Sequence, residues 1–482
     1  MKYFALLLSL AGLFGLNVRK EEPKNRPNIL FCLADDWGWP HAGAYGDLAI
    51  QTPNFDRLAA EGVLFENAYV SSPSCTPSRN AFITGKYHWE LGSGANLWST
   101  LPEEHESFIH LLKDQGYRIG RNLKKTWGPG SLDNWIAAHG EHPSGQGYEE
   151  LEDFLEATPD NQPFFFWLGT PDPHRPYEKG AGKKHGIDPE KVHLFPHFPN
   201  HEVVRNDVAD YYYEVERWDR LVGTAIRELE RRDLLENTII IMTGDHGMPF
   251  PRGKGNLYDS GTRVPFALRW GDQIKEPFIT ESFISFADIA PTLLESAGVE
   301  IPKDMTGKSF KPVIDGQSSG QQLITFGRER HVPAQEKPDM GGYPSRGLRT
   351  PQYLYIRNYK PQKWPAGTGK IGFTNFPNQW YADCDGGPTK DFIAEHKEEY
   401  PEAFHLAFAK RPEEELYILT DDPGQINNVA EYAQYQSILM KLREQLKSIQ
   451  TDLNDPRANE PNYTGFDGYP YLGGGGGKLG DK

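Results

Sequence analysis

Residues 28–36 read NILFCLADD, a run of apolar residues that ends in two aspartates. A short, continuous apolar run such as Asn28–Ala34 is typical of a strand that is buried on both faces of a parallel sheet. Three further runs have the same character, and they lie at Pro163–Leu168 (PFFFWL), Thr238–Thr243 (TIIIMT) and Val264–Trp270 (VPFALRW). The sequence therefore predicts a large, buried and mostly parallel sheet.

Segments with apolar residues at helical spacing lie between these runs. They are Asn54–Glu61, Ser107–Gln115, Asp210–Arg231 and Phe286–Ala297. Gly116 and Gly298 are placed to end two of them, because glycine adopts the left-handed conformation that often follows a helix. Strands that alternate with helices predict an α/β fold in which helices cover the sheet.

The composition changes after about residue 315. Residues 316–322 (GQSSGQQ) are typical of a linker, and strand-like segments follow at 323–327 (LITFG) and 352–358 (QYLYIRN). A long helix is predicted at about 432–453. We therefore expect an N-terminal catalytic domain at 26–318, a smaller α+β domain at 319–455, and a flexible, glycine-rich tail at 456–482.

The first twenty residues have the pattern of a secretory signal peptide. Lys2 supplies a positive charge, and an apolar run from Phe4 to Leu16 follows, which is short for a membrane span. An uncleaved anchor is the alternative reading. The leader predicts export to the periplasm or the medium, or to the lysosome in a eukaryote, and no later run predicts an integral membrane segment.

The charge balance limits the class of partner. The chain has 51 basic and 67 acidic residues, a formal charge of −16, which argues against broad binding of nucleic acid or anionic membranes. A few focused cations in a cleft still allow an anionic substrate. Its three cysteines predict no disulfide framework, and the oligomeric state is left open.

Polar residues follow three of the apolar runs at the point where each strand is predicted to end. They are Asp35 and Asp36 after the first, His174 and Arg175 after the second, and Asp245 and His246 after the third. Ligands bind outside the carboxyl ends of the strands in open parallel sheets. We therefore expect these side chains to converge on one site.

Asp35, Asp36 and Asp245 would repel one another at such a site unless a cation neutralised them. Their oxygen ligands, with His246 beside them, favour a hard ion such as Ca²⁺, or Mg²⁺, over zinc. Adjacent aspartates in a solvated loop are the alternative for Asp35 and Asp36 taken alone.

Residues 71–85 read SSPSCTPSRNAFITG and place one of the three cysteines in an unusual setting. Pro77 suits the first turn of a helix, so Cys75 is predicted just before that turn, where the helix dipole lowers the pKa of a thiol. A thiolate nucleophile and an inert buried cysteine are both compatible with this position. Neither explains the rest of the string.

The string CTPSR at 75–79, followed by the glycine of ITGKY, resembles the signature of the type I sulfatases. RPNILFCLADDWG, TGDHG and LYDSGTRVPF are also similar to that family, and the resemblance runs from about residue 26 to 455. It implies an alkaline phosphatase-like sandwich: a large mixed sheet flanked by helices, and a smaller C-terminal domain with an antiparallel sheet. Within the family, the segments LKKTWGP, PDPHR and GDHGMPFPRGKGNLYDSGT most resemble the heparan N-sulfatase (sulfamidase) branch.

The resemblance implies a role for each matching residue. Cys75 would be oxidised to formylglycine, by a formylglycine-generating or an anaerobic maturing enzyme, and its hydrate would attack sulfur and join the metal ligands Asp35, Asp36, Asp245 and His246. Arg79 would contact the hydrate and the metal carboxylates. Lys124, His174 and Lys254 would contact the sulfate, and His174 would also protonate the leaving atom.

The chain departs from the family pattern two residues after Lys124, where Thr126 replaces the usual histidine. Threonine cannot act as an acid or base near neutral pH, so either His174 carries all the proton transfer or another histidine of the chain takes part. Arg175 and the segment FGRERH, with Arg328, Arg330 and His331, are candidates for binding substrate carboxylates. An exposed, charged strand edge is the alternative for that segment.

The sequence as a whole predicts an exported sulfatase that removes sulfate from sulfated glycans, with N-sulfoglucosamine of heparan-type chains as the favoured group. An O-sulfatase on this or another polysaccharide, and a phosphoester or phosphonate hydrolase of the same superfamily, are alternatives within the fold. A non-catalytic glycan-binding relative, in which Thr126 marks lost activity, is an alternative of another class.

Overall fold

The computed structural model describes residues 26–123, 126–271 and 273–473. Within them, eight strands form one sheet in the order β10-β2-β9-β8-β1-β7-β4-β6. β9 runs antiparallel to both of its neighbours, and the other neighbouring pairs are parallel. The strands are β1 Asn28–Ala34, β2 Val63–Tyr69, β4 Arg118–Asn122, β6 Gln146–Tyr148, β7 Phe164–Gly169, β8 Thr238–Gly244, β9 Phe266–Arg269 and β10 Phe278–Ser285.

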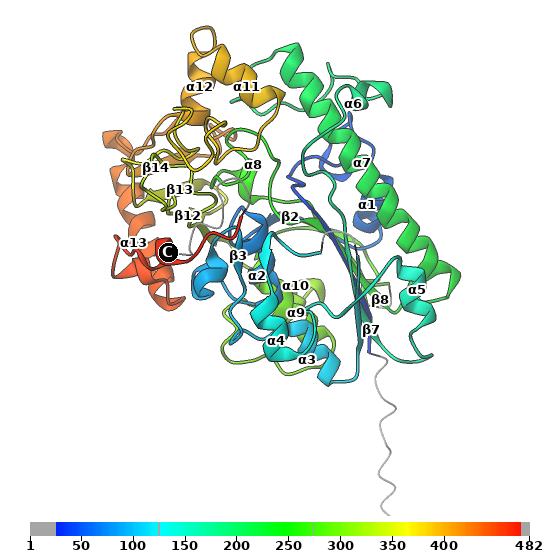
Figure 1. Ribbon diagram of the computed structural model, residues 1–482. Coiled ribbons are helices and arrows are strands. Elements are labelled where there is room, and N and C mark those ends of the chain that lie inside the picture. Colours follow the sequence, from blue (N-terminus) through cyan, green and yellow to red (C-terminus); the bar gives the residue numbers. More distant parts are fainter. Residues whose placement is uncertain (1–25, 124–125, 272, 474–482) are drawn as a thin grey trace, which may run out of the picture.

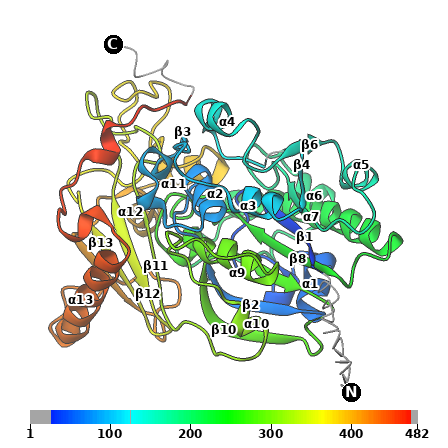
Figure 2. The ribbon, with the colours of Figure 1, turned by 90° about the horizontal axis from the view of Figure 1, so that it is seen from below.

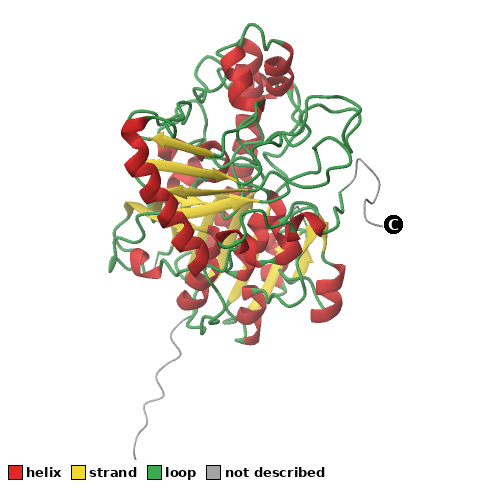
Figure 3. Ribbon diagram, turned by 90° about the vertical axis from the view of Figure 1, so that its left-hand side faces the viewer, coloured by secondary structure: helices red, strands yellow, loops and turns green. Residues whose placement is uncertain are grey.

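Helices cover both faces of this sheet. Figure 1 shows α7 (Glu202–Arg231) on one side, and α2 (Cys75–Thr84), α3 (Phe108–Asp114) and α9 (Ile289–Ser296) on the other. Figure 3 shows α7 lying across the strands. The remaining α-helices are α1 Pro53–Ala60, α4 Asp133–His139, α5 Leu151–Glu156, α6 Ala181–Lys184, α8 Asp259–Thr262, α10 Lys311–Ile314, α11 Pro388–Glu395, α12 Pro401–Phe408 and α13 Gln436–Asp452.

The side chains of β1 explain why the strand reads as one apolar run. Leu30 and Cys32 belong to the core layer beneath α7, whereas Ile29 and Phe31 belong to the layer beneath α2 and α3. Alternate side chains of a strand point to opposite faces, so both sets must be apolar when both faces are covered. The four strands predicted from such runs are present, with ends within two residues. The prediction of parallel strands is wrong for β9, which runs antiparallel to both of its neighbours.

A second sheet of four antiparallel strands lies beside the first, with α13 packed on it (Figure 2). Leu439, Leu442 and Leu446 of that helix form an apolar cluster with Leu348 and Tyr355 of the sheet. Its strands are β11 Ile324–Arg328, β12 Ser345–Arg349, β13 Tyr353–Asn358 and β14 Glu414–Ile418, and two short strands, β3 Ser99–Thr100 and β5 Gly130–Ser131, pair separately. The predicted fold class is confirmed.

Two helix boundaries differ from the prediction. α7 begins at Glu202 rather than Asp210, since the imidazole of His201 accepts a hydrogen bond from the Val203 N–H and caps the helix. α13 begins at Gln436 rather than at residue 432, because a 3₁₀ turn precedes it. Both predictions followed apolar spacing, which does not register these local ends.

The prediction of a flexible tail is wrong for residues 456–473. Phe466 is buried beside Tyr87 and Trp89 of the N-terminal part, and the Arg330 guanidinium donates to the backbone carbonyls of Tyr469 and Pro470. Aromatic anchors thus fix a segment whose glycine content predicts flexibility. Residues 474–482 and the predicted signal peptide at 1–20 lie outside the described residues, and the domain boundary at 318/319 stays a prediction.

No helix in the described part of the chain is both long enough and apolar enough to span a membrane.

Candidate active site

The ends of β1 and β8 place two acidic segments side by side. Ala34 pairs with Gly244 in the parallel register, so the aspartates that follow each strand are neighbours. The Asp36 N–H donates to Asp245 Oδ1 at 2.9 Å. A Cβ on Gly244 would lie 2.1 Å from the Trp37 carbonyl oxygen, which explains a glycine at this close approach.

Asp36 has a left-handed backbone conformation, with φ of 77°. Residues other than glycine adopt this region at a cost of about 1–3 kcal/mol, and such strain concentrates at functional sites. Here it directs the Asp36 carboxylate back toward the end of β8.

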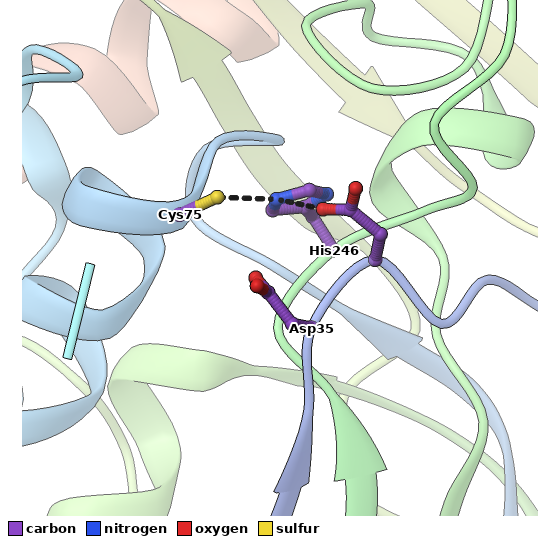
Figure 4. Close-up of side chains that lie close together, drawn as sticks. Asp35, Cys75 and His246 are labelled. Carbon is purple, nitrogen blue, oxygen red and sulfur yellow. Dashed lines mark hydrogen bonds and ion pairs between the residues drawn. The ribbon is translucent and has the colours of Figure 1, made fainter. Parts of the chain in front are cut away.

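The start of α2 carries Cys75 to the same rim. Its Sγ lies 3.3 Å from His246 Nε2, and the side chain is buried. Figure 4 shows Cys75 at the beginning of its helix, directed toward the His246 ring, with Asp35 nearby. The predicted convergence of Asp35, Cys75 and His246 is therefore seen in the structure.

The donor atoms of this cluster are close enough to share one ion. One atom each from Asp35, Asp36, Cys75 and His246 lies within 4.8 Å of the others, and Asp245 Oδ1 lies 3.5 Å from His246 Nε2. The His246 Nδ1 lies 3.0 Å from the Gly247 carbonyl oxygen, which can only accept. The hydrogen is therefore on Nδ1, and Nε2 offers its lone pair to the cluster.

Two permanent cations contact these carboxylates. Arg79, also on α2, donates from Nε to Asp245 Oδ2 at 2.9 Å and from Nη2 to Asp35 Oδ1 at 3.1 Å. Lys254 Nζ lies 3.0 Å from Asp36 Oδ1 and 3.1 Å from Asp385 Oδ2. Burial opposes the charge of Lys254, but the two carboxylates hold its pKa well above the usual value.

The charge balance of the cluster supports a divalent cation. Among the described residues, four carboxylates (Asp35, Asp36, Asp245 and Asp385) face the two permanent cations Arg79 and Lys254. Buried charge without compensation is costly, and an ion of charge +2 would restore neutrality. The oxygen-rich donor set fits a hard ion, as the sequence predicts.

Two histidines complete the surroundings. His174 Nε2 lies 4.0 Å from Asp36 Oδ2, and its Nδ1 lies 2.6 Å from the Arg175 carbonyl oxygen. His331 Nδ1 lies 2.8 Å from the hydroxyl of Ser74, the residue before Cys75. Burial, with the nearby Lys254 cation, holds the pKa of His331 well below its usual value.

Comparison with known proteins shows the family to which this chain belongs. Residues 27–299 match the family model described as Sulfatase, which is more than half of the chain. The chain belongs to the sulfatase family. Residues 244–365 also match the model described as N-sulphoglucosamine sulphohydrolase, C-terminal. The protein is accordingly a sulfuric ester hydrolase, and the family predicted from the CTPSR signature is confirmed.

Two relatives and one solved structure illustrate which proteins this chain is similar to. An ulvan-active sulfatase of Formosa agariphila is 30% identical over 86% of this chain and 78% of its own. Human N-sulphoglucosamine sulphohydrolase is 28% identical over 94% of this chain and 95% of its own. A structure solved in complex with its substrate D-glucosamine-2-N,6-O-disulfate matches with a TM-score of 0.64 and 20% identity, over 90% of this chain and 99% of the other.

The three arginines that the sequence proposes for substrate binding have protein partners in this sulfatase. Arg175 forms a two-pronged ion pair with Asp207, with both N–O distances 2.8 Å. Arg328 pairs with Asp383, and Arg330 holds the carbonyls of the C-terminal segment. Their contact with substrate stays a prediction. Lys124 lies outside the described residues, and Thr126 is buried.

Asp385 is the acidic residue of the site that sequence reasoning missed. It lies between β13 and α11, in the segment DCDGG, and follows no apolar run. Burial alone would raise the pKa of Asp385, but Lys254 and the neighbouring histidines hold this pKa below its usual value. No local pattern marks such a residue, because its position depends on how the loop between β13 and α11 packs against the large sheet.

Proposed function

We propose that this sulfatase is exported and removes sulfate groups from sulfated glycans, with N-sulfoglucosamine of heparan-type chains as the preferred group. The likeness to human N-sulphoglucosamine sulphohydrolase over almost the full length of both chains supports the preference, as does the match to that enzyme's C-terminal model. The leader-like first twenty residues support export.

The proposal includes conversion of Cys75 to formylglycine by a maturing enzyme, and a Ca²⁺ or Mg²⁺ ion held by residue 75, Asp35, Asp36, Asp245 and His246. The observation that carries it is the placement of Cys75 within 4.8 Å of the candidate ligand atoms of Asp35, Asp36 and His246. When bound, a divalent ion polarises a sulfate oxygen and lowers the pKa of a coordinated hydroxyl.

The charged side chains around residue 75 have distinct tasks. Arg79 holds Asp35 and Asp245 in place and keeps a positive charge beside the hydroxyl that attacks sulfur. Lys254 is placed to bind a sulfate oxygen and to stabilise the charge that develops on it in the transition state. The Lys254 ammonium and the Arg79 guanidinium are both fixed by buried carboxylates, so little reorganisation of these cations is needed during the reaction.

His174 is suited to protonate the leaving nitrogen or oxygen. Its Nδ1 hydrogen is directed at the Arg175 carbonyl, so Nε2 is the atom that faces the site. In the imidazolium form, Nε2–H can give its proton to the leaving atom as the bond to sulfur breaks. Thr126 cannot share this task.

The first experiment is peptide mass spectrometry of the tryptic segment that contains Cys75, from protein expressed with a formylglycine-generating enzyme. The expected result is the mass decrease that replacement of the CH₂–SH group by an aldehyde produces. An unmodified thiol in protein that hydrolyses sulfate esters would contradict the formylglycine chemistry.

The substrate preference needs a separate assay with defined disaccharides that carry one sulfate, either on nitrogen or on oxygen. We expect faster release from the N-sulfated compound. The relative that acts on ulvan favours the second candidate, an O-sulfatase on another sulfated polysaccharide, which predicts the reverse order. A matched pair of aryl sulfate and aryl phosphate tests the phosphoester alternative.

A further inference from the structure

A loop that begins at Asp383 enters the site from the second domain. At this end, the Asp383 carboxylate pairs with the Arg328 guanidinium and accepts the Val332 N–H at 3.0 Å. The Asp383 N–H in turn donates to the Ala366 carbonyl at 3.0 Å. The carboxylate and the backbone of Asp383 are therefore both fixed.

The other end of the loop is fixed by Asp207 of α7. Its carboxylate accepts from the Arg175 guanidinium, from the Thr389 N–H at 3.1 Å and from the Thr389 hydroxyl at 2.7 Å. Gly387 lies against the same guanidinium, since a Cβ there would be 2.5 Å from Arg175 Cζ. Arg328 and Asp207 thus hold the two ends of residues 383–389, and Asp385 is carried between them.

Asp385 lies on the more open side of the site. Its side chain is 27% exposed, whereas those of Asp36 and Lys254 are 0% and 5% exposed. Ligand atoms of Asp36, His174 and Asp385 lie within 4.8 Å of one another. A substrate that places its sulfur near residue 75 must therefore pass close to the Asp385 carboxylate.

A second metal ion is a poor explanation for this carboxylate. The Lys254 ammonium already lies 3.0 Å from Asp36 Oδ1 and 3.1 Å from Asp385 Oδ2, and so supplies the positive charge between them. A metal ion held by Asp36, His174 and Asp385 would lie beside this permanent positive charge and would be repelled by it.

An ionised carboxylate accepts hydrogen bonds, offers none, and repels sulfate oxygens. Asp385 is thus poorly suited to bind the sulfate itself, and its exposed oxygen needs a donor on the substrate. We propose that Asp385 is a specificity-determining residue that accepts hydrogen bonds from the N–H or O–H groups of the sugar ring next to the sulfated position. This role rests on the proposed function, and it selects sugar sulfates over sulfates of groups without donors.

The test compares Asp385→Asn and Asp385→Ser with wild type on a sulfated glucosamine disaccharide and on p-nitrophenyl sulfate, which has no such donors. Loss of a hydrogen bond to a charged group predicts a decrease of about 10- to 100-fold in kcat/KM for the sugar, mainly through KM. The aryl sulfate should change by less than about 3-fold. Asp391→Asn, on the helix that follows the loop, is the matched control and should alter neither substrate.

A second measurement uses p-nitrophenyl sulfate hydrolysis as the reporter and glucosamine as the inhibitor. The inhibition constant should rise in both Asp385 variants. Equal losses on both substrates would show that Asp385 only positions Lys254, and unchanged sugar kinetics would also overturn the proposal. The wild-type assay alone tests the proposed function. If wild-type enzyme cleaves the aryl sulfate but no sugar sulfate, the proposed function and the role of Asp385 are both overturned.

Discussion

The rim of the large sheet and the region beneath α13 each bury a cluster of charged side chains, and the two clusters differ in their charge balance. Beside the small sheet, Arg346 pairs with Asp455 and Glu329, and Arg457 pairs with Glu329, at distances of 2.7–3.0 Å. All four side chains are at most 2% exposed. Two cations therefore face two carboxylates, and this cluster is neutral by itself.

The cluster at the rim contains the same residue types in a different ratio. Its described members are four carboxylates and two permanent cations, together with His246 and Cys75. The neutral cluster needs nothing further and serves the scaffold, whereas the rim cluster has an excess of carboxylates that the proposed divalent ion would neutralise. Charge balance, rather than burial, separates the two roles.

The largest expected effect comes from Cys75→Ala, which removes the nucleophile from the rim cluster and leaves its charges unchanged. We expect kcat/KM for sulfate ester hydrolysis to fall by about 10⁴-fold or more, as for other covalent nucleophiles. Thermal unfolding in the presence of a chelator should stay close to that of wild type under the same condition, because the side chain is small and the ion pairs remain. Substantial residual turnover would place the catalytic group elsewhere.

Arg346→Met is the corresponding change in the neutral cluster. It removes Arg346, the cation that pairs with the buried Asp455 carboxylate, although Gln450 and the Arg457 N–H still donate to that carboxylate and Arg457 still pairs with Glu329. The lost cation should lower the free energy of unfolding by about 3–5 kcal/mol. Denaturant unfolding measures the loss, and kcat/KM of the folded enzyme should be unchanged. Adding Asp455→Leu restores neutrality and should recover part of the stability, whereas a lower kcat/KM would show that the two clusters are coupled.

Removal of divalent ions with a chelator should affect the rim cluster alone. Wild type should lose sulfatase activity and about 2–3 kcal/mol of stability relative to protein in excess Ca²⁺, the amount that binding at roughly one hundred times Kd supplies. Asp36→Asn should show a smaller difference between the two conditions. Equal stability of wild type with and without the ion would contradict the charge-balance account.

The smallest effect is expected for an exposed pair. Arg57 contacts Glu61 and Glu230 at 2.7 Å, but its side chain is 38% exposed. Solvent screening limits such pairs, so Arg57→Ala should lower the free energy of unfolding by less than about 1 kcal/mol. A loss comparable to that of Arg346→Met would mean that burial does not govern these ion pairs.

The rim could be predicted from sequence because its residues follow the strands directly. Asp35, Asp36, Asp245 and His246 each come within two residues of the end of β1 or β8, and the carboxyl ends of parallel strands meet at one edge. Cys75 and Arg79 were found through a continuous signature. The register of β1 and β8 then decides the spacing of the residues that follow these two strands.

The contribution of the second domain could not be predicted in this way. Arg328 and Arg330 are candidates for binding substrate, and the structure gives them protein partners that the sequence does not predict: Asp383 for Arg328, and the C-terminal segment for Arg330. Asp385 lies in a loop between elements that do not pair with the large sheet. Such contacts depend on how two domains pack, and neither periodicity nor spacing in the chain records that.

The most direct test of the central claim is a crystal structure of the protein, co-expressed with a formylglycine-generating enzyme and grown in calcium. The account predicts one ion whose ligands include Asp35, Asp36, Asp245 and the oxidised side chain of residue 75. It is contradicted if the electron density shows no ion between these side chains, or shows residue 75 converted but pointing away from them.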